Sequence, residues 1–235
     1  MRKLLVFLFL CGMVIVFVGV ANAVPIQFDL VDGDWDNAVA DPVGGTITIV
    51  NSPATGGTST ARWGTSTGYG QSGYDFVSRD TPFSVLSDSG LFLLGTFTHL
   101  NYPITGTSLD TIDLDISLGS IVSVTAVFNI DHNETPNTGG SASNDIVTIL
   151  NPIVNSPFTY LGDDYFFNLF GFSQDGGATV ATIFSTVEGQ ANCADLYASI
   201  TSAPIPAVPE PATMLLLGSG LMGLAAAGRR KFFKK

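Results

Sequence analysis

The sequence has very few basic residues outside its two ends. It contains nine Lys and Arg residues against 20 Asp and Glu residues, and no lysine occurs between Lys3 and Lys231. Between residues 24 and 207 there are two basic residues and 19 acidic ones, so this part carries a formal charge of −17. Binding to nucleic acid or anionic lipid depends on Lys and Arg, which displace counterions from phosphates. The shortage of Lys and Arg therefore excludes a nucleic-acid role. It is typical of a soluble exported protein or of one that collects divalent cations.

Cysteine and histidine are also scarce. Cys11 lies in the apolar start of the chain and Cys193 is the second of two cysteines, so the fold cannot depend on a disulfide within the domain. We expect Cys193 to be a small buried side chain. The two histidines belong to no His-Glu-x-x-His or Cys-x-x-Cys pattern, which argues against a metalloprotease and a structural zinc site. We interpret His99 as shaping a loop after a strand and His132 as part of a polar hairpin tip, and we predict no catalytic residue.

No window between residues 24 and 202 has a convincing helical period. Short segments rich in Val, Ile, Thr and Phe alternate instead with turn-forming clusters of Gly, Pro, Asn and Asp. Strands are expected near residues 26–30 and 47–49 and over residues 91–98, 109–118, 122–130, 145–150, 165–172 and 179–187. This spacing predicts one all-β domain over residues 24–202, with a two-sheet sandwich of jelly-roll type as the expected architecture.

Residues 1–23 are typical of a secretory signal peptide. Arg2 and Lys3 give the positive start, residues 4–20 form the apolar core, and Ala21 and Ala23 form the small-x-small cleavage site. The expected partners at this end are the Sec translocon and signal peptidase. An uncut N-terminal anchor is the alternative, and the Ala-x-Ala ending argues against it.

The last 28 residues have three parts. The motif Val208-Pro209-Glu210-Pro211 comes first, an uncharged run over residues 212–228 follows, and a basic tail occupies residues 229–235. As a helix the uncharged run spans about 25 Å, just enough for a bilayer core. The basic tail keeps its own end in the cytoplasm, so the domain before it lies on the periplasmic side. Residues 203–207 read as a proline-rich linker.

This three-part layout resembles the PEP-CTERM sorting signal of Gram-negative bacteria that make exopolysaccharide. The resemblance implies that an exosortase cuts near Val208, Pro209, Glu210 and Pro211. It also implies that anchoring in the inner membrane is transient and that the product reaches the cell surface or the medium. The alternative is an ordinary uncut anchor, in which a run of small residues lets another helix approach closely.

Two segments in the middle of the chain resemble choice-of-anchor domains of type K, which are secreted modules joined to different surface anchors. The residues that carry this resemblance are Trp63, Gly64, Ser72, Gly73, Thr98, His99, Asn101, Pro103 and Ile104. The resemblance implies a surface-displayed β-domain and no particular activity.

The best candidate for chemistry is a calcium loop near the start of the domain. Asp32, Asp34 and Asp36 occupy the first, third and fifth positions of a calcium-type loop. Asn37 stands where an EF-hand has glycine and Val43 where it has the bidentate glutamate, so an EF-hand is excluded. A looser calcium site and a solvated acidic turn remain as alternatives, and calcium is the one cofactor that the sequence suggests.

Together these features predict an exported, surface-sorted and non-enzymatic β-domain that acts in the extracellular matrix, in a biofilm or in surface binding. Aromatic side chains stack on sugar rings when exposed but more often fill the core of a sandwich. The candidates are Trp35, Trp63, Tyr69, Tyr74 and Tyr102. The alternative is a polysaccharide hydrolase displayed by the same route, which would need two facing carboxylates about 5–10 Å apart.

Overall fold

The computed structural model describes residues 25–52, 56–119, 123–136 and 143–205. These residues form β-strands joined by turns, and none of them lies in an α-helix, so the all-β prediction is confirmed. Within the same residues, no helix has the length and apolar character needed to cross a membrane. The signal peptide of residues 1–23 and the sorting signal of residues 208–235, with its helix over 212–228, lie outside the described residues.

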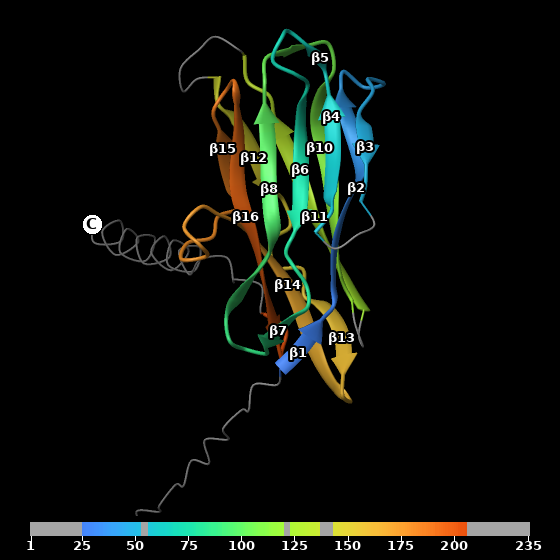
Figure 1. The fold of residues 1–235 in the computed structure, drawn as a ribbon, viewed down its shortest axis with the longest axis vertical. Helices are drawn as coiled ribbons and strands as arrows, with labels where there is room; N and C mark the ends of the chain where they lie inside the picture. Colours follow the sequence, from blue (N-terminus) through green and yellow to red (C-terminus); the bar gives the residue numbers. More distant parts are fainter. Residues whose placement is uncertain (1–24, 53–55, 120–122, 137–142, 206–235) are drawn as a thin grey trace, which may run out of the picture.

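Two antiparallel sheets face each other and account for most of the domain (Figure 1). The five-stranded sheet has the order β15 (Ile183–Thr186), β12 (Asp145–Ile149), β11 (Ser123–Asn133), β10 (Ser108–Gly119) and β2 (Leu30–Asp41). The seven-stranded sheet has the order β13 (Ser156–Tyr160), β14 (Asp163–Ser173), β16 (Gln190–Thr201), β8 (Leu91–Asn101), β6 (Ser72–Ser78), β4 (Thr58–Trp63) and β3 (Thr48–Val50). Two short pairs complete the fold, β1 (Pro25–Phe28) with β7 (Phe83–Leu86) and β5 (Thr65–Ser66) with β9 (Ile104–Thr105).

The order of the strands does not confirm the jelly-roll connections. Three successive strands, β10, β11 and β12, are neighbours in the five-stranded sheet. In the other sheet β3, β4, β6 and β8 follow one another across one half in chain order. Much of each sheet is therefore a meander, in which successive strands pair with each other rather than alternating between the two sheets.

Strict alternation along the central strands explains why the two sheets pack together. In β10, Ile112, Leu114 and Ile116 are buried, whereas the aspartates between them point outward. The facing sheet contributes large aromatic side chains, of which Phe76 and Phe97 are at most 1% exposed. Burial of each such side chain is worth roughly 1.5–3 kcal/mol, so this interior supplies the main driving force for folding.

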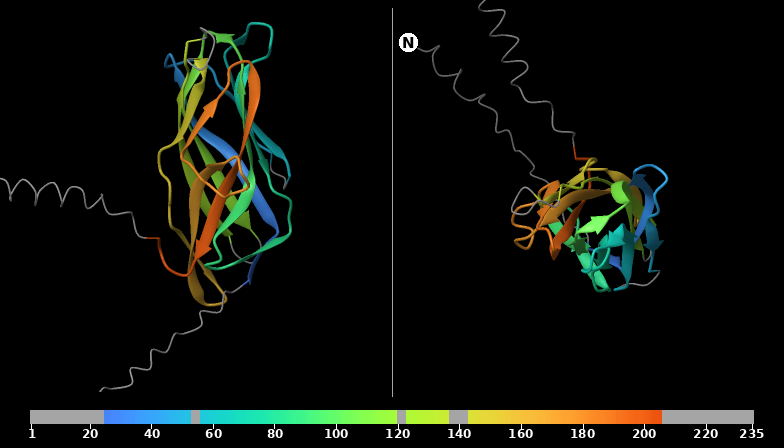
Figure 2. Two further views of the ribbon diagram at one scale, coloured as in Figure 1. Left: turned by 90° about the vertical axis from the view of Figure 1, so that its left-hand side faces the viewer. Right: turned by 90° about the horizontal axis from the view of Figure 1, so that it is seen from above.

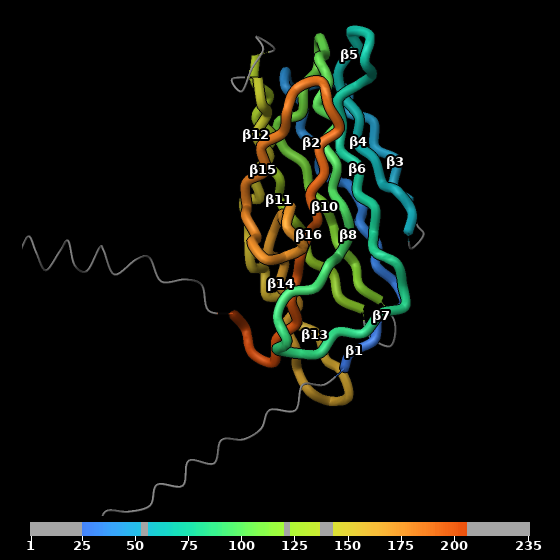
Figure 3. Tube along the Cα trace, turned by 60° about the vertical axis from the view of Figure 1, so that its left-hand side comes forward, coloured from blue at the N-terminus to red at the C-terminus, as the bar shows by residue number. Residues whose placement is uncertain are grey.

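Both ends of the described chain lie at the same end of the sandwich (Figures 1 and 2). β1 begins there, and the chain leaves β16 there beside β13 and β14, as the tube in Figure 3 shows. The side-chain amide of Asn155 donates to the carbonyl of Ile205 at 3.0 Å and accepts from its N–H at 2.7 Å. The first residues of the predicted linker over 203–207 are therefore held against the domain.

Candidate functional site: a polar cluster between the sheets

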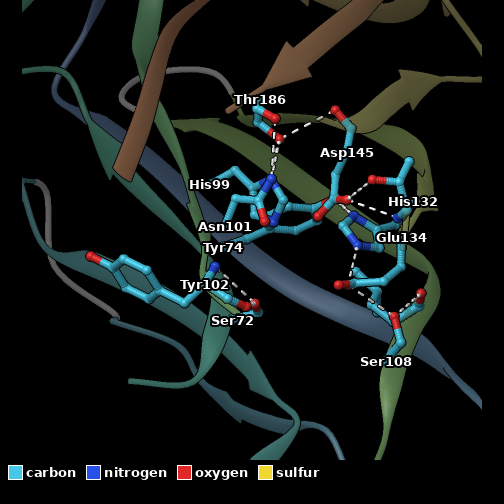
Figure 4. Close-up of polar contacts among 12 residues, drawn as sticks. Ser72, Tyr74, His99, Asn101, Tyr102, Ser108, His132, Glu134, Asp145 and Thr186 are labelled. Carbon is cyan, nitrogen blue, oxygen red and sulfur yellow. Dashed lines mark hydrogen bonds and ion pairs between the residues drawn. The ribbon is translucent and has the colours of Figure 1, made fainter. Parts of the chain in front are cut away.

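Near the end of the sandwich opposite to the chain termini, polar side chains from both sheets meet in the interior (Figures 1 and 4). β8 contributes His99 and Asn101, β11 contributes His132, and β12 contributes Asp145. Thr186, at the end of β15, joins them. All five side chains are buried: His132 is 5% exposed and the other four are fully enclosed. The alternation of each strand directs these residues inward, at positions where apolar residues occupy the rest of the core.

A hydroxyl group fixes the orientation of the His99 ring. Nδ1 of His99 lies 2.8 Å from Oγ1 of Thr186, which donates its proton to the backbone carbonyl of Asp145 at 3.3 Å. Because that proton is already used, the Nδ1–H of His99 donates to Thr186. Burial lowers the pKa of His99 well below its usual value, with a smaller contribution from His132, so the ring is neutral. Its Nε2 therefore carries a lone pair, and it has no hydrogen-bond partner among the described residues.

One oxygen of Asp145 is held and the other is free. Oδ1 accepts from the N–H of Thr135 at 2.8 Å and from its hydroxyl at 3.1 Å. Oδ2 is sealed from solvent and has no partner in the described part of the chain. Burial, and then repulsion from Glu134, raise the pKa of Asp145 to about 6 against the opposing effect of the Thr135 hydrogen bonds. The environment thus disfavours the charged carboxylate unless a cation or a proton compensates it.

His132 bridges the interior to the edge of the site. Its Nδ1 lies 2.6 Å from the hydroxyl of Tyr74, and its Nε2 lies 3.2 Å from Oε2 of Glu134. Tyr74 is fully buried, and burial raises its pKa well above the usual value, so its neutral hydroxyl donates to His132. The same Glu134 oxygen accepts from the hydroxyl of Ser108 at 3.2 Å.

A third carboxylate approaches from the turn after β15. Both oxygens of Glu188 are sealed from solvent and lack a hydrogen-bond partner among the described residues. Burial raises the pKa of Glu188 to about 7, and the carboxylates of Asp145 and Glu134 add to the effect. A buried polar atom left unpaired costs about 1–3 kcal/mol, so a cluster of such atoms indicates a missing partner.

An aromatic wall closes the cluster on the side of the seven-stranded sheet. The ring centroid of Trp63 lies 4.9 Å from that of Tyr74, 5.2 Å from that of His132 and 6.0 Å from that of His99. The two imidazole centroids are 5.1 Å apart and nearly perpendicular. These contacts exclude water from the face of each ring and hold both imidazoles in position.

An open hollow of about 310 Å³ lies just outside the cluster. Its lining is strongly acidic and comes from the ends of β2, β10 and β11: Asp41, Ser108, Leu109, Asp110, Asp131, His132, Asn133 and Glu134. His132 and Glu134 therefore belong to both the hollow and the buried cluster. The hollow offers a polar approach from solvent to the interior.

Both histidine predictions and the Cys193 prediction are wrong in placement. His99 lies within β8 rather than in a loop after it, and His132 lies within β11 rather than at a hairpin tip. Each occupies an inward position of a strand whose pairing continues past it. Cys193 is exposed, because it points outward from β16 beside Thr98, 3.4 Å from its hydroxyl.

The predicted calcium loop is a strand. Asp32, Asp34 and Asp36 lie on the outward face of β2, and β10 pairs Asp115 with Asp34 and Asp113 with Asp36. Alternate residues of a strand are roughly 6.6 Å apart, so Asp32 and Asp36 are about 13 Å apart and cannot share one ion. We call these five aspartates the acidic ladder. The loop geometry is wrong, and calcium binding stays a prediction.

The segments that suggested a choice-of-anchor domain lie side by side on β4, β6 and β8. Trp63 pairs with Ser72, Gly73 pairs with Leu100, and the hydroxyl of Ser72 donates to the carbonyl of Tyr102 at 2.7 Å. A Cβ at Gly64 would lie 2.4 Å from the Ile104 side chain, which explains the glycine. Thr98, Asn101 and Pro103 belong to the same end of β8 or follow it. The arrangement supports a structural role for these residues.

A comparison with models of known protein families matches residues 207–231 to the PEP-CTERM protein-sorting motif. The match confirms the predicted sorting signal and indicates a substrate of an exosortase: an exported protein, anchored in the membrane as a precursor and then sorted to the surface. The resemblance of the domain to choice-of-anchor modules is not supported. No curated protein matches the chain.

Proposed function

We propose that this protein is a non-enzymatic surface module that acts in the extracellular matrix or in surface binding after exosortase processing. The observation that carries the proposal is the match of residues 207–231 to the sorting motif, because it sets the destination of the domain. A signal peptide over residues 1–23 and a membrane helix over residues 212–228 are the expected means of export and anchoring.

The burial of the reactive groups supports a role without catalysis. His99, Asp145 and Tyr74 are fully enclosed, so a polymeric substrate has no access to them. A general acid or base must come within hydrogen-bond reach of the atom whose proton it transfers. The three side chains are within hydrogen-bond reach of groups inside the cluster and not of a polymer outside it.

The end of the sandwich remote from the chain termini is the surface best suited to a ligand. It carries the acidic hollow and the loop of Tyr69, which is 71% exposed. Trp35, Trp63 and Tyr74 are at most 1% exposed and do not present a face to a sugar ring. We therefore propose that Tyr69 and Tyr102 are the aromatic contacts with exopolysaccharide or another surface polymer.

Retention of the processed protein in isolated matrix tests this proposal. Tyr69→Ala should lower the fraction retained, whereas Tyr160→Ala, at the end of the sandwich where the chain leaves, should not. Equal retention of both variants and the unchanged protein would contradict binding through the remote end. We also propose that calcium is held loosely on the acidic ladder, so the same retention measurements are made with and without a calcium chelator.

A second candidate, a polysaccharide hydrolase displayed by the same route, is favoured by one observation. The hollow brings Asp41, Asp110, Asp131 and Glu134 to one surface, and paired carboxylates are what glycoside hydrolysis requires. Incubation with the host exopolysaccharide and measurement of new reducing ends separates the two functions. Release that disappears in Glu134→Gln and in Asp131→Asn would replace the binding proposal with the hydrolase.

A further inference from the structure

Three potential metal ligands converge in the polar cluster. His99, His132 and Asp145 each offer one ligand atom, and these atoms all lie within 4.8 Å of one another. Zinc binds imidazole nitrogen and carboxylate oxygen at about 2.0–2.2 Å, which places tetrahedral ligands roughly 3.3 Å apart. The three side chains would therefore need only small rotations to close on one ion. They come from β8 in one sheet and from β11 and β12 in the other.

In the described part of the chain, most of the unpaired buried atoms in and around the cluster are acceptors, whereas the indole Nε1–H of Trp63 in the aromatic wall is an unpaired donor. Nε2 of His99, Oδ2 of Asp145, Oδ1 of Asn101 and both oxygens of Glu188 are sealed and have no partner among the described residues. Such atoms need a donor or a cation. Within the part of the chain that the structure describes, no side chain supplies either, although the opposite atoms of His99 and Asp145 are held by Thr186 and Thr135.

The hydrogen bonds to Nδ1 of His99 and Oδ1 of Asp145 are of the kind that orient the ligands of a bound metal ion. A histidine that binds a metal through one ring nitrogen usually donates its other N–H to an oxygen, which fixes the ring. His99 donates Nδ1–H to Thr186 and leaves Nε2 free, and Asp145 is fixed through Oδ1 and leaves Oδ2 free. His132 would become the third ligand by exchanging one of its present partners, the Tyr74 hydroxyl or Glu134.

The charge around the cluster also favours a bound cation. Burial raises the pKa values of Asp145 and Glu188, the Glu134 carboxylate raises both further, and Asp145 adds to the effect on Glu188. The basic side chains of the described residues are Arg62 and Arg79. Arg62 pairs with Asp75, and Arg79 lies 3.9 Å above the ring of Phe83, so both are engaged elsewhere.

We propose that His99, His132 and Asp145 bind a divalent transition-metal ion, with zinc as the best fit, which ties the two sheets together. The donor set of two imidazoles and a carboxylate favours zinc over calcium or magnesium, which prefer oxygen ligands alone. Both oxygens of Glu188 lack a partner among the described residues, but Glu188 does not belong to the group of ligand atoms that lie within 4.8 Å of one another, so it is not assigned as a ligand. The enclosure of the site is typical of a structural rather than a catalytic zinc centre. The acidic hollow beside His132 is the route by which the ion enters.

Metal binding by the full-length chain, purified in detergent and stripped with a chelator, tests this proposal. We expect one equivalent of Zn²⁺ to bind and the melting temperature to rise with zinc concentration. Co²⁺ in its place should give the intense visible absorption of a tetrahedral site. A melting temperature that is the same with zinc and with chelator, together with no stoichiometric metal, would overturn the proposal and leave protons as the compensation for the buried acids.

Matched variants locate the ion. Asp145→Asn keeps the shape and the Thr135 contact but removes the charge, and it should weaken zinc affinity by about 100-fold or more, because the loss of outer partners alone costs about 10–100-fold. Thr186→Val keeps all three ligands but releases Nδ1 of His99, and it should weaken affinity by about 10–100-fold. Asp163→Asn, at an exposed position of β14 outside both the polar cluster and the acidic ladder, is the control and should bind like the unchanged protein.

Each remaining result also decides the proposal. If Asp145→Asn fails to fold, Thr186→Val and the Co²⁺ spectrum of the unchanged chain carry the test. Zinc that is lost in Asp34→Asn, on the acidic ladder, but kept in Asp145→Asn and Thr186→Val would place the ion on the surface and overturn the buried site. The outcome is independent of the matrix-binding test, since that test varies Tyr69 and measures retention.

Discussion

The hydroxyl of Tyr74 lies 2.6 Å from Nδ1 of His132 and links the two sheets through the middle of the domain. Tyr74 belongs to β6 of the seven-stranded sheet and His132 to β11 of the five-stranded one. Most of the other contacts between these sheets are apolar and non-directional. Together with the bonds from His99 and Asn101 to Thr186, this hydrogen bond helps to align the two sheets near the polar cluster.

Tyr74→Phe should lower the free energy of unfolding by about 1–3 kcal/mol, because it keeps the packed ring but leaves a buried imidazole nitrogen without its donor. Chemical denaturation of the purified protein measures this change. Tyr69→Phe removes the hydroxyl of an exposed tyrosine and serves as the control, with no expected loss. Equal stability of the two variants would show that the Tyr74 contact contributes nothing.

Gly33→Ala should destabilise the domain although it lies in a strand with ordinary backbone angles. A Cβ at this position would lie 2.3 Å from the ring of Phe76 in the facing sheet. Overpacking of this kind costs about 1–3 kcal/mol. Gly119→Ala is the matched control, since its nearest contact would be the Leu30 side chain at 3.2 Å. A thermal melt in which both variants lose the same stability would contradict the close approach of Phe76.

Asp115→Asn should stabilise the protein at neutral pH. Burial raises the pKa of Asp115, and repulsion from Asp113, Asp36 and Asp34 raises it further. A carboxyl with a higher pKa in the folded state contributes stability below its ordinary pKa of 3.8, and this contribution is lost as the pH rises through the folded-state value. The gain from the substitution should be about 0.2–1 kcal/mol, as for a cross-strand pair of like charges.

The pH dependence of melting checks this expectation. The advantage of Asp115→Asn should be present at pH 7 and should vanish below the ordinary carboxyl pKa, where both proteins are neutral at this position. Asp163→Asn, on β14 and far from the acidic ladder, is the control. An advantage that persists unchanged into acid would assign the effect to something other than charge repulsion.

Calcium on the acidic ladder should raise the melting temperature, because a bound cation relieves the repulsion among its carboxylates. The comparison is between excess Ca²⁺ and a calcium-selective chelator. Asp34→Ala should reduce the difference, since Asp34 stands opposite Asp115. Identical melts in the two solutions would leave the ladder as a solvated acidic surface.

The sorting signal predicts the chemical form of the mature protein. Replacement of Pro209, Glu210 and Pro211 by alanine should leave the precursor in the inner membrane, because the exosortase then loses its recognition motif. Mass spectrometry of the surface fraction measures the result. A peptide over residues 214–228 still attached to the surface form of the unchanged protein would indicate a plain anchor instead.

The sequence predicted the all-β class and several strands well where apolar residues alternate strictly. β10 and β11 are examples, since buried apolar residues such as Leu114 and Phe128 occupy every second position along most of each strand. β16 was missed because its inward positions include Ala194 and Ala198, which carry little β signal. β4 and β6 were not predicted either, since Ser, Thr and Gly supply many of their residues.

The candidate site was missed because its members are far apart in the chain and ordinary in their local setting. His99, His132 and Asp145 share no motif, and strand pairing alone brings them together. The scarcity of lysine and arginine was a usable signal, since it implied that any buried carboxylate would need another cation. The loop prediction for Asp32, Asp34 and Asp36 was wrong because the same alternate spacing also places carboxylates along one face of a strand. Gly33 makes room there for Phe76.

The two hydrogen bonds between Asn155 and Ile205 limit how far the folded domain can move from the membrane before the exosortase cuts the chain. The predicted membrane helix starts at residue 212, seven residues after Ile205, and this stretch extends to at most about 25 Å. The predicted precursor therefore has a short connection between the folded domain and the membrane. The polar cluster and the acidic hollow lie at the opposite end of the sandwich, so they are the parts of the domain farthest from the segment that the exosortase is expected to cut.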